Sequence, residues 1–235
     1  MLRRRNRRKG LFVKLGATEV LDIAARSELD FVVVDLEHSQ LSEADGVRLT
    51  RHAAALGLPA LVRLPELDRG SVNRLLEAGA RGIQLSTVRS IAQVEALGAA
   101  TRYAPDGDRS VSLAHPSAGY GDAPLADYLE AQALSPPELV IQIETAETDD
   151  PLEDVLAAGA DVAFVGTTDL SVDVGLDAGR LRERVEAIAT AADAAGVELG
   201  GFALEHPDVT YDVSGSDVAL LRAAVGEHAR KHANA

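Results

Sequence analysis

Cysteine is absent from this 235-residue sequence, and no apolar run approaches the ~20 residues needed to cross a bilayer. The lack of cysteine excludes disulfides and thiolate chemistry, and it is typical of proteins from a reducing compartment. No secretory signal is visible. We therefore expect a cytoplasmic protein with no membrane-spanning segment.

Lysine is also scarce, since the sequence contains only Lys9, Lys14 and Lys231. Schiff-base catalysis needs a lysine at the reacting centre. Lys9 and Lys231 lie near the two ends of the chain, so Lys14 is the one remaining candidate. The sequence therefore disfavours Schiff-base chemistry.

Positive charge is concentrated at the start of the chain. The formal net charge is −14, and the basic N-terminal tip, residues 1–9, contributes six positive charges, so the remainder carries −20. A body this acidic repels nucleic acid and anionic membranes. The tip could bind RNA or lipid headgroups, but such segments are more often solvated helices or subunit contacts. We expect no nucleic-acid partner and no membrane partner.

Short apolar runs alternate with helical patterns along the chain, and nothing divides it into two domains. The predicted strands are 11–15, 31–34, 60–63, 82–86, 139–144, 162–166, 199–203 and 217–221, and the predicted helices are 18–27, 43–56, 68–78, 90–100, 149–159, 179–195 and 222–229. This alternation predicts an α/β fold, a single (β/α)₈ TIM barrel over residues 1–235. An open doubly wound sheet is the alternative, but no Gly-x-Gly-x-x-Gly opens a first helix.

A segment rich in proline and glycine, residues 101–137, interrupts the alternation and contains a predicted helix at 125–133. Loops of this length in compact domains are usually functional. We expect this loop to lie near the active site.

Two acidic residues follow neighbouring strands. Glu144 ends one apolar run and Asp169 follows the next, and a strand–helix–strand unit makes these strands parallel. Adjacent strands are about 4.8 Å apart, so both carboxylates fall at the carboxyl ends of strands. Oxygen ligands of this kind suit Mg²⁺ or Mn²⁺. The local alternative is that Glu144 starts a loop and Asp169 caps a helix.

Further polar residues end other predicted strands: Glu37, His38, Arg63 and Gln142. Each has a structural explanation, such as capping, ion pairing or a polar network in the barrel. Their convergence on one face favours a shared site. The set suits a carbon–carbon lyase, in which a metal is the Lewis acid, an arginine stabilises an enolate and a histidine moves a proton.

Four blocks of sequence, in order, resemble the HpcH/HpaI aldolases, the metal-dependent class II 2-oxo-acid aldolases. The blocks are Asp35-Leu-Glu37-His38-Ser39, Leu61-Val-Arg63, Ile141-Gln142-Ile-Glu144-Thr145 and Val165-Gly166-Thr-Thr-Asp169-Leu-Ser171. The loop sequences Arg102–Arg109 and Gly119-Tyr-Gly121 also match. The resemblance covers roughly residues 10–222.

The resemblance implies a barrel that exchanges its last helix with a neighbouring subunit, in a trimer or a hexamer of two trimers. It implies that Glu144 and Asp169 hold Mg²⁺, Mn²⁺ or Co²⁺, and that Arg63 stabilises the pyruvate enolate. His38 would be the base or proton relay. The remaining roles fall to Gln142 (pyruvyl group), Glu37 (support of the site), Glu77 (orientation of His38) and the backbone amides of Gly166, Thr167, Thr168 and Asp169 (substrate carboxylate).

Two positions depart from the family pattern. The family commonly has Gly-Pro-Ala/Asn-Asp where this chain has Gly166-Thr-Thr-Asp169, and Pro116 stands where an arginine often precedes Ala-Ala-Gly-Tyr-Gly. The first change is compatible with binding through backbone amides. The second bears on contacts to the aldehyde.

The expected activity is metal-dependent, reversible cleavage of a 4-hydroxy-2-oxo acid, such as a 2-dehydro-3-deoxy sugar acid, to pyruvate and an aldehyde. One alternative is a lyase for a 3-hydroxyacyl-CoA of the malyl- or citramalyl-CoA type, which the acidic body disfavours. Another is a barrel that binds a 2-oxo acid without turnover.

Overall fold

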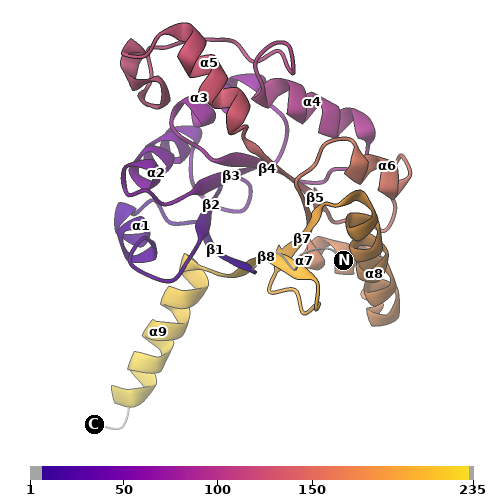
Figure 1. Ribbon diagram of the computed structural model, residues 1–235. Helices are drawn as coiled ribbons and strands as arrows, with labels where there is room; N and C mark the ends of the chain where they lie inside the picture. Colours follow the sequence, from indigo (N-terminus) through magenta and orange to yellow (C-terminus); the bar gives the residue numbers. More distant parts are fainter. Residues whose placement is uncertain (1–6, 233–235) are drawn as a thin grey trace.

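Eight parallel strands, each hydrogen-bonded to the next along the chain, close into a barrel in the computed structural model, which describes residues 7–232 (Figure 1). The strands are β1 (Arg8–Val13), β2 (Phe31–Asp35), β3 (Ala60–Leu64), β4 (Gly82–Leu85), β5 (Glu138–Ile143), β6 (Val162–Val165), β7 (Glu198–Phe202) and β8 (Val209–Ser216). The predicted (β/α)₈ barrel is confirmed.

Helices surround the barrel, and α9 alone extends away from it in Figure 1. The helices are α1 (Thr18–Ala24), α2 (Glu43–Ala55), α3 (Arg69–Glu77), α4 (Ile91–Thr101), α5 (Leu125–Leu134), α6 (Leu152–Ala157), α7 (Thr167–Asp173), α8 (Ala178–Ala195) and α9 (Asp217–His232), with a 3₁₀ turn, η1, at Pro116–Gly121. Local sequence fixes several ends: Ser42 and Ser90 form capping boxes, and Gly196 ends α8 in the left-handed conformation.

The strands are buried on both faces because alternate side chains point into the barrel and out to the helices. In β2, Val33 belongs to an aromatic-rich cluster inside the barrel, while Val32 and Val34 belong to the larger cluster between the strands and the helices. Phe12, Phe164 and Tyr211 fill the interior with edge-to-face contacts. This packing explains why the strands appear as continuous apolar runs.

The prediction for the eighth strand is wrong. Residues 217–221 begin α9, and β8 lies just before them at Val209–Ser216. Polar residues such as Asp212 interrupt the apolar pattern of β8 and obscure it. Asp217 is buried, and its carboxylate accepts the N–H groups of Lys14 and Leu15. The apolar run that follows it resembles a strand in sequence, but its side chains are exposed on α9.

The described part of the basic tip belongs to the barrel. Arg8 begins β1, and its guanidinium lies over the rings of Phe31 (5.7 Å) and Tyr211 (5.0 Å) and pairs with Glu138 (2.5 Å) and Glu198 (3.4 Å). Burial alone lowers the pKa of Arg8, but these carboxylates outweigh it and raise that pKa. Residues 1–6 lie outside the described residues. Arg8 therefore closes the amino-terminal end of the barrel.

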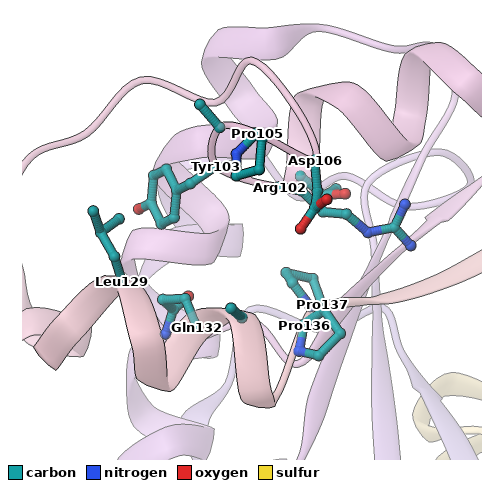
Figure 2. Close-up of a pocket in the computed structure, with 11 residues that line it drawn as sticks. Arg102, Tyr103, Pro105, Asp106, Leu129, Gln132, Pro136 and Pro137 are labelled. Atoms are coloured by element: carbon teal, nitrogen blue, oxygen red, sulfur yellow. The ribbon is translucent and has the colours of Figure 1, made fainter. Parts of the chain in front are cut away.

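The long loop packs outside the barrel, against α3. Arg109 is buried over the Tyr103 ring (4.7 Å) and donates to Asn73 of α3 (3.0 Å), while the hydroxyls of Tyr103 and Tyr128 are 3.0 Å apart. A pocket of about 390 Å³ lies between the two arms of the loop, where α4 ends and β5 begins, and Figure 2 shows the residues that line it. That is the amino-terminal side of the strands. The expectation that the loop lies near the site is not met within one chain.

In the part of the chain from residue 7 to residue 232, every helix is too short or too polar to traverse a bilayer.

Candidate active site

Asp35, at the carboxyl end of β2, is the centre of a buried charge network. The carboxylate accepts from Arg63 Nε (2.9 Å) and Nη2 (2.6 Å), and Lys14 Nζ lies 2.8 Å from it. Burial alone raises the pKa of Asp35, but the Arg63 guanidinium and the Lys14 ammonium outweigh it and hold that pKa well below its usual range. The network joins the ends of β1, β2 and β3.

Arg63 is 5% exposed and stacks over the Phe12 ring at 4.5 Å. Its Nη1 lies 3.4 Å from Glu37 Oε2. A guanidinium has five N–H groups. Two of these donate to the Asp35 carboxylate, and Nη1 makes only a longer ion pair with Glu37, so N–H groups remain for a ligand.

Glu37 connects Arg63 to the end of β4, because it accepts the Ser86 hydroxyl at 2.6 Å. His38 Nε2 lies 3.7 Å from Glu37 Oε2, which is beyond a direct hydrogen bond, and the His38 side chain is 56% exposed. Lys14 Nζ also donates to the His38 carbonyl at 3.1 Å. The imidazole therefore borders the network and is free to reach a substrate.

Glu144 is a second buried carboxylate, but its partners are neutral. It accepts the Thr87 hydroxyl (2.5 Å) and the Gln142 amide, and Gln142 in turn accepts from Gln84 Nε2 (2.7 Å). Within residues 7–232 no cation pairs with Glu144. A buried, uncompensated carboxylate is costly, and a bound cation would offset that cost.

The residues around Glu144 fit a divalent cation. Gly166 packs so closely on Glu144 that an added Cβ would overlap the carboxylate. Asp169 lies exposed in the first turn of α7, three residues after Gly166. Oxygen donors of this type suit Mg²⁺ or Mn²⁺. In the described chain no group of three or more His, Cys, Asp or Glu residues is arranged to hold a metal, so such a cation would depend on substrate or water oxygens as well.

The first turn of α7 carries Thr167, Thr168 and Asp169, and no side chain caps it. The first backbone N–H groups of a helix have no partner within the helix. The Gly166 N–H itself is used, since it donates to Ile143 O at 3.1 Å. The free amides therefore come from residues after Gly166.

Glu77 does not join this site. It lies at the carboxyl end of α3, and helices of the barrel run opposite to the strands, so it is at the amino-terminal side. Its side chain accepts from Asn73 (3.1 Å), and its carbonyl accepts from Ser117 (2.9 Å). Within one chain Glu77 therefore lies away from His38, and its role in orienting His38 stays a prediction.

Sequence reasoning gave no role to Asp35, Ser86 or Thr87. Asp35 was visible as a carboxylate ending a wholly apolar strand, a weak signal for a buried ion pair. Ser86 and Thr87 follow β4 and bond to Glu37 and Glu144 respectively. Nothing in the sequence near Ser86 or Thr87 marks these contacts, because each acceptor comes from another strand.

The fold and this arrangement define a TIM-barrel enzyme whose polar groups collect at the carboxyl ends of the strands, where enzymes of this fold place their active sites. The family model described as "HpcH/HpaI aldolase/citrate lyase" matches residues 8–216. The chain therefore belongs to the HpcH/HpaI aldolase/citrate lyase family, and it is a carbon–carbon lyase of the aldolase type.

Several individual proteins are similar to this chain. A hydroxypyruvate/pyruvate aldolase from Paraburkholderia phytofirmans is 32% identical, over 83% of this chain and 78% of its own length. A 4-hydroxy-4-methyl-2-oxoglutarate aldolase from Hapsidospora irregularis is 31% identical, over 77% of this chain and 69% of its own. The crystal structure of a family member from Burkholderia cenocepacia has a TM-score of 0.87 at 25% identity, covering 96% of this chain and 94% of that one.

We predict that Asp35→Asn destabilises the protein by about 3 kcal/mol at pH 7, because the buried Arg63 and the partly exposed Lys14 lose their partner. A carboxyl whose folded pKa is depressed contributes stability above its unfolded pKa, and that stability is lost as the pH falls below about 4. Urea unfolding at a series of pH values should show that the difference in the free energy of unfolding between the variant and wild type narrows below pH 4. Asp193→Asn, at an exposed position on α8, is the control. A difference in the free energy of unfolding between Asp35→Asn and wild type that does not vary with pH would contradict the ion-pair argument.

Proposed function

We propose that this protein is a divalent-metal-dependent aldolase that reversibly cleaves a 4-hydroxy-2-oxo acid to pyruvate and an aldehyde. The observation that carries the proposal is that two groups occur together at the carboxyl end of the barrel. Arg63 is held in place by Asp35, and Glu144 is buried with no cation in the described chain to compensate its charge. The names of the similar aldolases, which refer to pyruvate and 4-hydroxy-2-oxo acids, support the substrate class.

Glu144 and Asp169 would hold Mg²⁺, Mn²⁺ or Co²⁺. When bound, the cation would supply Lewis acidity to the carboxylate and keto oxygens of the substrate. Gln142, which is fixed by Gln84 and Glu144, would contact the pyruvyl group. The free amides of Thr167 and Thr168 would bind the substrate carboxylate, as the first turn of a helix favours anions.

Cleavage requires a proton to leave the 4-hydroxyl group while the C3–C4 bond breaks. The electron pair of that bond passes to the 2-oxo group to give the enolate of pyruvate, and C4 becomes the aldehyde carbon. The remaining N–H groups of Arg63 would donate to the enolate oxygen, which gains charge in the transition state. His38 would carry the hydroxyl proton, and protonation at C3 then completes pyruvate.

Lys14 takes no covalent part in this proposal. Its ammonium pairs with Asp35 and donates to the His38 carbonyl, so it serves the charge network. Borohydride treatment with pyruvate should accordingly leave Lys14 unmodified.

We further propose that the protein is a homo-oligomer, a trimer or hexamer, in which α9 packs on a neighbouring subunit. Figure 1 shows α9 directed away from its own barrel. Its apolar side chains Val218, Leu220, Leu221 and Val225 are between 42% and 60% exposed. Apolar patches of this kind mark protein interfaces.

Chelation tests the proposed activity. Pyruvate release from 4-hydroxy-2-oxo acids should disappear in EDTA and return when Mg²⁺ or Mn²⁺ is restored, because substrate binding and enolate stabilisation both need the cation. A lactate dehydrogenase-coupled assay, with the coupling enzyme checked in EDTA, measures this. Full activity in EDTA would refute the metal requirement, and no pyruvate from any 4-hydroxy-2-oxo acid would refute the substrate class.

Substitution of Arg63 tests its proposed role. Arg63→Ala should lower kcat by on the order of 10²-fold or more, because it removes donors to a developing oxyanion. Arg81→Ala is the matched control, since the Arg81 side chain lies before β4 and donates to the Pro136 carbonyl at the other end of the barrel. Both variants need a melting curve to confirm folding. An unchanged rate in a folded Arg63→Ala protein would remove this residue from the reaction.

Light scattering tests the assembly. The wild type should have the mass of a trimer or hexamer, and a double variant with Leu221→Asp and Val225→Asp should dissociate, because two charges would enter an apolar contact. Ala223→Asp, on the opposite side of α9, should leave the mass unchanged. A monomeric wild type, or an unchanged mass in the double variant, would contradict the proposed packing.

A further inference from the structure

Thr87, the second residue after β4, has an unusual backbone conformation. Four non-glycine residues within 7–232 have a positive φ, and Thr87, at φ 50°, is the one with a branched Cβ. Branched side chains are strongly disfavoured in this region. The residue is exposed to solvent, so no packing contact accounts for the threonine.

The turn itself explains the conformation but not the side chain. The Ser86 N–H donates to Leu64 O of β3 (3.1 Å), and the Val88 N–H donates to Gln142 O of β5 (3.0 Å). The backbone thus passes from one neighbouring strand to the other within two residues, and Val88 is fully buried beyond it. Glycine or asparagine would adopt this turn with less strain.

The hydrogen bond of the Thr87 hydroxyl explains why a threonine occupies this position. Thr87 Oγ1 donates to Glu144 Oε1 at 2.5 Å, while the Gln142 amide donates to the other carboxylate oxygen. Gln142 is held in turn by Gln84 Nε2 at 2.7 Å. The Glu144 carboxylate is therefore fixed from both sides by neutral donors, which orient it and leave its negative charge uncompensated.

We propose that Thr87 is a positioning residue that orients Glu144 for cation binding, a conclusion that rests on the proposed role of Glu144 as a metal ligand. Hydrogen bonds to a ligating carboxylate fix its orientation, and their loss typically costs 10–100-fold in metal affinity. A neutral hydroxyl is suited to this task, because a lysine or arginine in its place would compete with the cation for the charge.

Mn²⁺ affinity without substrate tests the role of Thr87 independently of turnover. Electron paramagnetic resonance of free Mn²⁺, titrated with the full-length protein, should give an affinity at least about tenfold weaker for Thr87→Val than for wild type. Thr87→Ser retains the hydroxyl and should stay within about twofold. Thermal unfolding without metal establishes that each variant is folded.

Thr87→Gly separates positioning of Glu144 from a purely structural role. Glycine relieves the backbone strain but lacks the hydroxyl, so the apo protein should remain folded while Mn²⁺ binding falls as in Thr87→Val. Wild-type Mn²⁺ affinity in both folded variants would overturn the role of Thr87 alone. No Mn²⁺ binding by folded wild type would instead overturn the proposed metal site, and with it this inference.

Discussion

The buried ion pair between Asp35 and Arg63 is the interaction on which the rest of the site depends. A carboxylate with no exposed surface is stable there only because Arg63 and Lys14 compensate its charge. The pair fixes the ends of β1, β2 and β3 relative to one another. It also determines which N–H groups of Arg63 are occupied and which remain, so a structural pair sets the geometry of the proposed oxyanion donor.

The two buried carboxylates of the site differ in what surrounds them. Asp35 meets two cations, whereas Glu144 meets an amide and a hydroxyl. Asp35 is therefore already neutralised and has a supporting role. Glu144 retains a charge that a bound cation can use. The two carboxylates have different tasks because the neighbouring strands supply different partners. The turn after β4 contributes Thr87, which donates to Glu144.

The two ends of the barrel use charge in opposite ways. At the amino-terminal end, Arg8 lies over Tyr211 and pairs with Glu138 and Glu198. Those charges satisfy one another and close the interior. At the carboxyl end, N–H groups of Arg63 remain without a partner among the described residues, and the charge of Glu144 is not compensated by a cation there. The first arrangement stabilises the barrel, and the second leaves the groups that we propose bind a 2-oxo acid.

The sequence by itself determined the barrel and most of its rim. Apolar runs located seven strands, and parallel strands must bring their carboxyl ends to one edge, which placed Glu37, Arg63 and Glu144 together. Only the tertiary structure decided which side chains bond to one another. Asp35 and Arg63 are 28 residues apart in the sequence, and Thr87, which follows β4, bonds to Glu144, which follows β5. The polar residues that alternate along β8 concealed that strand in the sequence. Glu77 lies at the amino-terminal end of the barrel because the helices run opposite to the strands. Contacts between residues of different strands could not be predicted, because they leave no local pattern in the sequence.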